Sequence, residues 1–91
     1  MTKRLFFRVH GEVQGVGFRY FTREKAAAHG LTGWVRNTRD CTVEGEAQGP
    51  EADLALFLAD LETGPRHAQV ARLEREDREA LRPEDGFEIR R

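Results

Sequence analysis

The transition that decides the fold lies in residues 5–19, which read LFFRVHGEVQGVGFR. At the start of this stretch every second residue is apolar, a period of two that predicts a strand with one apolar face. Three glycines then interrupt the pattern. Residues 20–28 have high helix propensity, and Gly30 is well placed to end a helix there. The first unit is therefore predicted to be a strand, a glycine loop and a helix.

A hairpin and a second helix are predicted next. Residues 33–36 and 42–47 have the character of two short strands, joined by a turn over residues 37–41 in which Asn and Asp favour turn geometry. Gly49-Pro50 opens a helix whose leucines and phenylalanine recur at helical spacing, and Gly64-Pro65 closes it. This second helix is the clearest one in the chain.

The last third of the chain predicts the weaker elements. Residues 68–74 predict a strand with a bulge or at a sheet edge, residues 77–85 a loop, and residues 87–89 a short final strand at an edge. The resulting order indicates an α+β fold, the ferredoxin-like βαββαβ sandwich, in which two helices cover one face of an antiparallel sheet. We expect a single domain over residues 1–91.

Composition and charge limit the possible partners. The chain has 91 residues, of which 38% are hydrophobic and 34% charged, and a formal net charge of -1, so no overall field attracts nucleic acid or an anionic membrane. A lone cysteine cannot form an internal disulfide, and the first seven residues are too polar and short for a signal peptide. No apolar stretch approaches the ~20 residues that span a bilayer. We expect a cytoplasmic monomer without a membrane or nucleic-acid partner.

The glycine loop is the most informative segment for function. In residues 13–19, VQGVGFR, small residues let backbone N–H groups converge where a helix begins, and Arg19 adds a fixed charge beside them. Arginine suits phosphate because its planar guanidinium donates two parallel hydrogen bonds. A plain glycine turn with a solvated Arg19 explains the spacing equally well at this point.

Several other chemistries are excluded by residues that are missing. No Gly-Lys-Ser or Gly-Lys-Thr follows the loop, so it is not a nucleotide-triphosphate loop. Cysteine-dependent phosphatases need a nucleophile where this chain has Val13. RNA-recognition domains need aromatic residues on the third strand, which here carries Glu44 and Glu46. The three histidines show no metal-ligand spacing, so we predict no metal site.

Three segments together resemble the acylphosphatase family: residues 11–19 (GEVQGVGFR), residues 30–37 (GLTGWVRN) and Gly49-Pro50. The match spans nearly the whole chain, and the joint occurrence of the first two segments is highly specific. The resemblance implies the ferredoxin-like fold. It also implies hydrolysis of small acyl phosphates to a carboxylate and inorganic phosphate by direct water attack, with no covalent intermediate and no cofactor.

The resemblance also implies residue roles. Arg19 would be catalytic as the phosphate-binding arginine, and Asn37 as the residue that orients the attacking water. The substrate-binding residues would be Gln14, Gly15, Val16, Gly17, Phe18, Arg19 and Thr38. The chemistry agrees, because a mixed anhydride already has a stable carboxylate as its leaving group, so positioning and charge stabilisation suffice.

Two positions depart from the family pattern. Cys41 follows Asp40 where the family commonly has glycine, so a left-handed backbone there would cost roughly 1 to 2 kcal/mol. His29 stands where an aliphatic residue is frequent, which predicts a partly polar seam between the helices.

Alternative functions remain open at this stage. The chain is alternatively a non-catalytic phosphate- or anion-binding module, a carbamoyl-phosphate-handling domain of the kind attached to larger enzymes, or a nucleic-acid-binding module. For Asn37 the alternative is a residue that caps its own turn.

Overall fold

The computed structural model describes residues 2–81 and 85–91. Its elements follow one another as β1 (Thr2–Glu12), α1 (Phe18–Ala28), β2 (Thr32–Asn37), β3 (Val43–Pro50), α2 (Glu51–Thr63), β4 (Gln69–Arg78) and β5 (Phe87–Ile89). This order confirms the predicted succession of strand, helix, strand, strand, helix and strand, with the short final strand after it. The α+β, ferredoxin-like fold class is confirmed.

The strands form one sheet in the order β4-β1-β3-β2-β5. Four strands pair antiparallel, as predicted, but β5 pairs with β2 in parallel. The reason is the direction of β4, which runs opposite to β1 and β2. The chain enters β5 at the end of the sheet where β4 finishes. Strand β5 therefore runs opposite to β4 and parallel to β2. The sheet is therefore mixed, with the parallel pairing confined to one edge.

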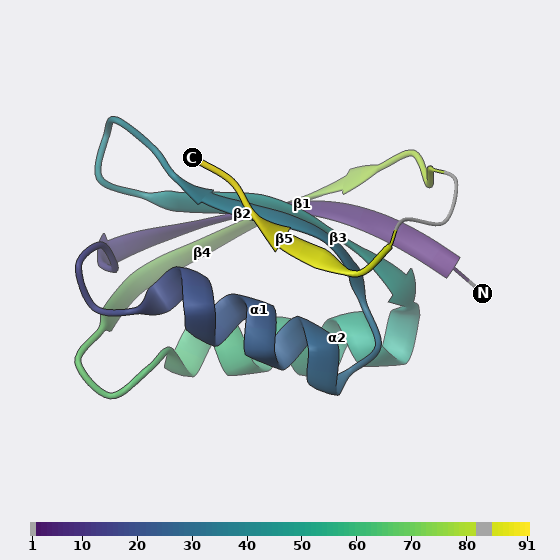
Figure 1. Cartoon of the computed structure of the whole chain (residues 1–91), viewed down its shortest axis with the longest axis horizontal. Coiled ribbons are helices and arrows are strands. Elements are labelled where there is room, and N and C mark those ends of the chain that lie inside the picture. Colours follow the sequence, from purple (N-terminus) through teal and green to yellow (C-terminus); the bar gives the residue numbers. More distant parts are fainter. Residues whose placement is uncertain (1, 82–84) are drawn as a thin grey trace.

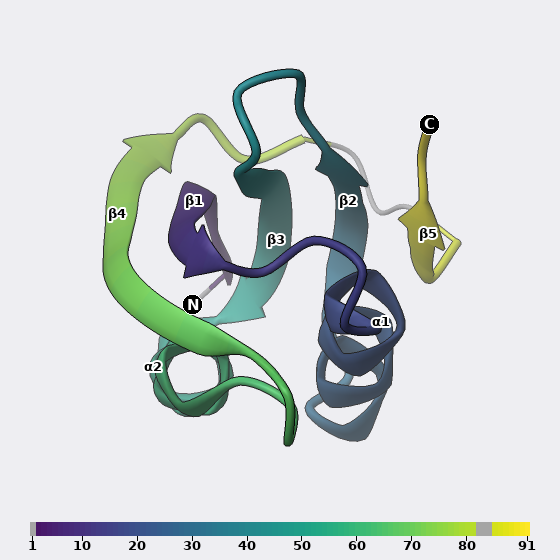
Figure 2. The ribbon, with the colours of Figure 1, turned by 90° about the vertical axis from the view of Figure 1, so that its left-hand side faces the viewer.

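Both helices lie on one face of this sheet, as Figures 1 and 2 show. The apolar side of β1 faces them, because Leu5, Phe7 and Val9 are all buried at the strand period of two. Helix α2 packs against this side of β1 with buried apolar side chains at helical spacing. The Phe57 ring contacts the Phe7 ring edge-on, with 5.6 Å between the two ring centroids. The apolar residues at the strand period in β1 and those at helical spacing in α2 therefore belong to one core.

A polar contact joins the C-terminal end of α1 to α2. His29, the C-cap of α1, lies 2.9 Å from Asp60 of α2, measured between Nε2 and Oδ2. The predicted polar seam is confirmed. Both side chains are partly exposed, so the contact lies at the rim of the core.

Strand β4 is longer than predicted. Asp77 and Arg78, which the sequence placed in a loop, continue the strand because β1 begins at Thr2 and offers backbone partners for them. Their side chains are exposed, so charge did not prevent pairing at the sheet edge. Residues 82–84 of the predicted loop lie outside the described residues.

The predicted bulge and edge position of β4 are confirmed. His10 pairs with Arg72 while Gly11 pairs with Val70, so Ala71 has no partner on β1. Gly11 has φ 127°, and a Cβ there would lie 2.1 Å from the Gln69 carbonyl oxygen. Only glycine fits at this close approach, which lies just before the loop that leads to α1.

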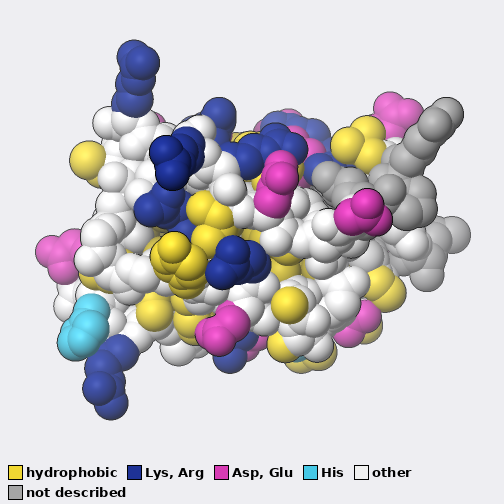
Figure 3. All heavy atoms as spheres, in the orientation of Figure 1, with side chains coloured by type: hydrophobic (Ala, Val, Ile, Leu, Met, Phe, Trp, Pro, Cys, Tyr) yellow, Lys and Arg dark blue, Asp and Glu magenta, His cyan; other side chains and the backbone are white. Residues whose placement is uncertain are grey.

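The other face of the sheet carries charged and aromatic side chains. Trp34 of β2 lies on this face with two guanidinium groups over its ring, Arg36 at 5.4 Å and Arg90 at 4.8 Å from the ring centroid. Lys and Arg side chains gather around the C-terminal end of β5 and the hairpin side of β2 (Figure 3). The molecule therefore has an apolar layer between sheet and helices and a highly charged outer sheet face.

Candidate active site

The loop between β1 and α1 turns through two left-handed glycines. Gly15 has φ 74° and Gly17 has φ 76°, and a Cβ at either position would meet no atom within 4 Å. Space is therefore not the constraint. Glycine is needed because other residues adopt this backbone conformation only at a cost.

Helix α1 begins at Phe18, two residues earlier than predicted, and its N-terminus is uncapped. Gly17 occupies the N-cap position without a side-chain cap, and the first turn has no acidic residue. The Phe21 N–H donates to the Gly17 carbonyl at 3.0 Å, so the N–H groups before it have no acceptor within the helix. Such a terminus offers several donors and a partial positive charge to an anion.

Arg19 lies in this first turn, beside two further arginines. It lines an open depression of about 480 Å3 together with Tyr20, Arg23, Ile89 and Arg91. Within residues 2–81 and 85–91, none of these three arginines forms an ion pair. The depression is therefore locally cationic in a protein whose net charge is -1.

The apolar side chains of the loop point inward. Phe18 is 2% exposed and belongs to the core, and Val16 packs against the core from the side. The Phe18 side chain is therefore withdrawn from solvent, whereas the Val16 side chain is partly exposed. At Phe18 the predicted cradle can offer a ligand only its backbone N–H group.

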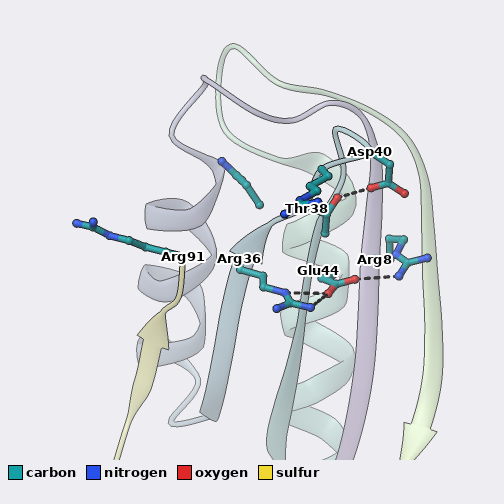
Figure 4. A pocket seen from close by; sticks show the side chains of 8 residues that line it. Arg8, Arg36, Thr38, Asp40, Glu44 and Arg91 are labelled. Carbon is teal, nitrogen blue, oxygen red and sulfur yellow. Dashed lines mark hydrogen bonds and ion pairs between the residues drawn. The ribbon is translucent and has the colours of Figure 1, made fainter.

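Asn37 lies at the end of β2, opposite Val43 of β3, and is half-buried. It lines a second open depression, of about 730 Å3, whose lining residues Figure 4 shows. Arg91 lines both depressions, so the one with Arg19 and the one with Asn37 adjoin. The fold thus brings the two predicted catalytic residues, from α1 and β2, to neighbouring parts of one surface.

The turn after Asn37 is held by its own side chains. The Thr38 hydroxyl bonds to the Asp40 carboxylate and lies 2.7 Å from the Thr42 hydroxyl, which in turn donates to Asp40 at 2.9 Å. These hydrogen bonds from Thr38 and Thr42 lower the pKa of the Asp40 carboxyl. Cys41 adopts φ 68°, so the turn keeps the left-handed backbone that carries a cost for a residue other than glycine.

The Thr38 hydroxyl is therefore occupied within the turn, and a contact between Thr38 and substrate stays a prediction. Gln14 likewise has a partner outside the predicted cradle. Its side-chain nitrogen donates to the backbone carbonyls of Thr38 and Thr42, each at 2.9 Å. The side chain thus reaches from the glycine loop to the hairpin.

Sequence reasoning missed the ion network beneath Asn37. Glu44 is 6% exposed and accepts hydrogen bonds from Arg8 at 2.8 Å and Arg36 at 2.7 and 2.9 Å (Figure 4). Burial opposes ionisation of Glu44, but the two guanidinium groups outweigh it and the pKa of the carboxyl is lowered. The signal was present in the sequence, since all three residues occupy the polar phase of their strands with opposite charges.

The part of the chain that the structure describes contains neither a group of possible metal ligands nor a membrane-spanning helix. No three His, Cys, Asp or Glu side chains group there in a way that could hold a metal ion. No helix there is long and apolar enough to cross a membrane.

Comparison with known proteins identifies the family. The family model for acylphosphatase matches residues 5–89. The acylphosphatase of Geobacillus kaustophilus is 49% identical over 87 residues, covering 96% of this chain and 93% of that protein. The crystal structure of acylphosphatase from Bacillus subtilis superposes with a TM-score of 0.94 at 35% identity, covering 100% of both chains. The structure of HypF from T. kodakarensis matches 98% of this chain with 12% of its own, at a TM-score of 0.85 and 32% identity. The chain belongs to the acylphosphatase family.

Proposed function

We propose that this chain hydrolyses acyl phosphates to a carboxylate and inorganic phosphate by direct attack of water on phosphorus. No covalent intermediate, metal or cofactor takes part. Family membership supports the reaction class. The observation that carries the mechanism is a helix N-terminus without a side-chain cap, with an Arg19 that forms no ion pair among the described residues, adjoining the depression that Asn37 lines.

The phosphate group lies at the start of α1 in this proposal. The backbone N–H groups of residues 15–19 and the Arg19 guanidinium donate to its non-bridging oxygens. As the bond to the acyl oxygen lengthens, negative charge spreads over these oxygens. In this proposal the folded loop fixes these donors before the substrate binds, so little reorganisation is required in the transition state.

Asn37 orients the attacking water. Its amide oxygen accepts a hydrogen bond from the water and directs the water's lone pair toward phosphorus, but an amide is a poor base. The new bond joins the water oxygen to phosphorus while the bond from phosphorus to the acyl oxygen breaks. The carboxylate leaves with that electron pair, and a phosphate oxygen takes the proton.

The recognised group is the phosphate, which all acyl phosphates share. The in-line geometry directs the acyl group away from Asn37, so we expect broad specificity for the acyl part. We further propose that residues 1–91 act as one domain, and that the protein is a cytoplasmic monomer without a nucleic-acid partner.

The experiment is benzoyl phosphate hydrolysis in the presence of EDTA. Arg19→Ala and Asn37→Ala are compared with the wild type and with Arg66→Ala, which removes an exposed arginine outside both depressions. Losing Arg19 should reduce kcat/KM by at least ~100-fold, as removal of one preorganised donor does. Arg66→Ala should match the wild type.

Two outcomes would refute the proposal. Full activity in the Arg19→Ala protein would show that phosphate does not bind through Arg19 at the start of α1. A folded wild type that binds phosphate without turnover would identify an anion-binding module instead, for which the three arginines of the Arg19 depression provide an equally good site.

A further inference from the structure

The Gln14 side chain connects the two halves of the proposed site. We propose that it is a positioning residue that sets the distance between the phosphate loop and Asn37, and that it does not contact substrate through its amide. This inference rests on the proposed function, because it assumes that phosphate binds at the start of α1 and water at Asn37.

The contacts leave the Gln14 amide no free hydrogen. A side-chain NH2 group has two donors. One is used on the Thr38 carbonyl and the other on the Thr42 carbonyl, each at 2.9 Å between nitrogen and oxygen. The amide therefore spans the base of the turn that follows Asn37.

These two bonds are the direct hydrogen-bonded link between the loop and the turn. In the described part of the chain, no other hydrogen bond joins residues 13–17 to residues 37–42. The anchor is firm on the loop side, since Val13, next to Gln14, is buried in the core at 1% exposure. It is firm on the turn side as well, because Thr38 N–H donates to the Thr42 carbonyl at 3.0 Å.

Loss of the Gln14 contacts should slow the reaction step without weakening the binding of phosphate. Phosphate contacts come from the backbone of residues 15–19 and from the Arg19 guanidinium, none of which uses the Gln14 side chain. The position of the water relative to phosphorus depends instead on where Asn37 stands with respect to the loop. A displacement of about 1 Å at a reacting pair can reduce the rate ~100-fold.

The test replaces Gln14 by Met, which keeps the length and removes both donors. Gln14→Asn is the second variant, because it keeps the amide but shortens its reach by one methylene. Gln69→Met is the matched control, since Gln69 is exposed on β4 and lines neither site depression. For each protein we would measure kcat and KM on benzoyl phosphate, the Ki of inorganic phosphate, and urea unfolding.

We expect both Gln14 variants to lower kcat by about 10- to 100-fold while the phosphate Ki changes less than about threefold. In an Asn37→Ala background, Gln14→Met should lower kcat by less than about threefold, because the group that it positions is already gone. The Gln69→Met protein should match the wild type in kcat, KM and Ki.

Three results would overturn the positioning role. One is an unchanged kcat in folded Gln14 variants, and another is a rise in phosphate Ki that matches the fall in kcat. The third is full additivity of Gln14→Met with Asn37→Ala. An inactive wild type, or an Asn37→Ala protein with full activity, would overturn the water site itself and this inference with it, so the two failures are distinguishable.

Discussion

Replacing Cys41 by glycine should stabilise the protein. Cys41 has φ 68° and is the one residue other than glycine with positive φ in the described ranges 2–81 and 85–91. Its thiol is free and its side chain exposed. The left-handed backbone therefore destabilises the folded state, and the exposed side chain provides little packing to offset that cost.

The magnitude follows from two opposing effects. Holding a residue with a Cβ in the left-handed region costs about 1–2 kcal/mol, and glycine removes that cost. Glycine also gives the unfolded chain more freedom, which destabilises the folded state by about 0.5–1 kcal/mol. The midpoints of these two ranges differ by about 0.75 kcal/mol in favour of glycine, which for a domain of this size raises Tm by roughly 3–6 °C.

Urea unfolding followed by circular dichroism measures this difference, with Cys41→Ala as the matched control. Alanine removes the thiol but keeps the Cβ, so Cys41→Ala should remain within about 0.5 kcal/mol of the wild type. Equal stabilisation by alanine and glycine would refute the backbone argument and point to the thiol. A glycine variant no more stable than the wild type would refute the cost assigned to the turn.

Three further predictions concern the site and its surroundings. Glu44→Gln should destabilise the protein by about 1–3 kcal/mol, because two guanidinium groups lose a charged acceptor. Since the folded pKa of Glu44 is lowered, its contribution is present above the unfolded carboxyl pKa and lost as pH falls through the folded value, so urea midpoints of variant and wild type should converge in acid. Asp40, whose pKa is also lowered, should give the turn the same sign of dependence, and Asp40→Asn should flatten the acid side of the stability profile. Gly17→Ala should cost about 1–2 kcal/mol in unfolding free energy and reduce kcat/KM, since Gly17 has φ 76° beside the proposed phosphate donors.

The fold was largely predictable because its signals are local. The strand period of β1, the glycine loop before α1 and the proline and glycine at the ends of α2 each indicate one element, and together they indicate one topology. Apart from the start of α1, which lies two residues earlier than predicted, the errors occurred at the sheet edges. The charged end of β4 pairs because an edge strand leaves its side chains in water, and the parallel direction of β5 depends on how the chain returns across the sheet.

The candidate site was predicted less completely. The glycine loop, Arg19 and Asn37 could be proposed from the sequence because each belongs to a short continuous segment. The Gln14 side chain has its partners 24 and 28 residues away in the sequence, and Glu44 has one partner 8 residues away and another 36 residues away. Such contacts follow from strand register and from how the loop crosses the sheet end, neither of which a local pattern contains.

The pair of arginines over Trp34 has a practical consequence. Trp34 is the chain's single tryptophan, and the two guanidinium groups over its ring come from different places, Arg36 in β2 and Arg90 just beyond β5. Indole fluorescence responds to charges near the ring, so its emission should shift when the C-terminal strand separates from β2. The protein thus contains an intrinsic optical reporter for the docking of its edge strand, usable in stopped-flow experiments without any added label.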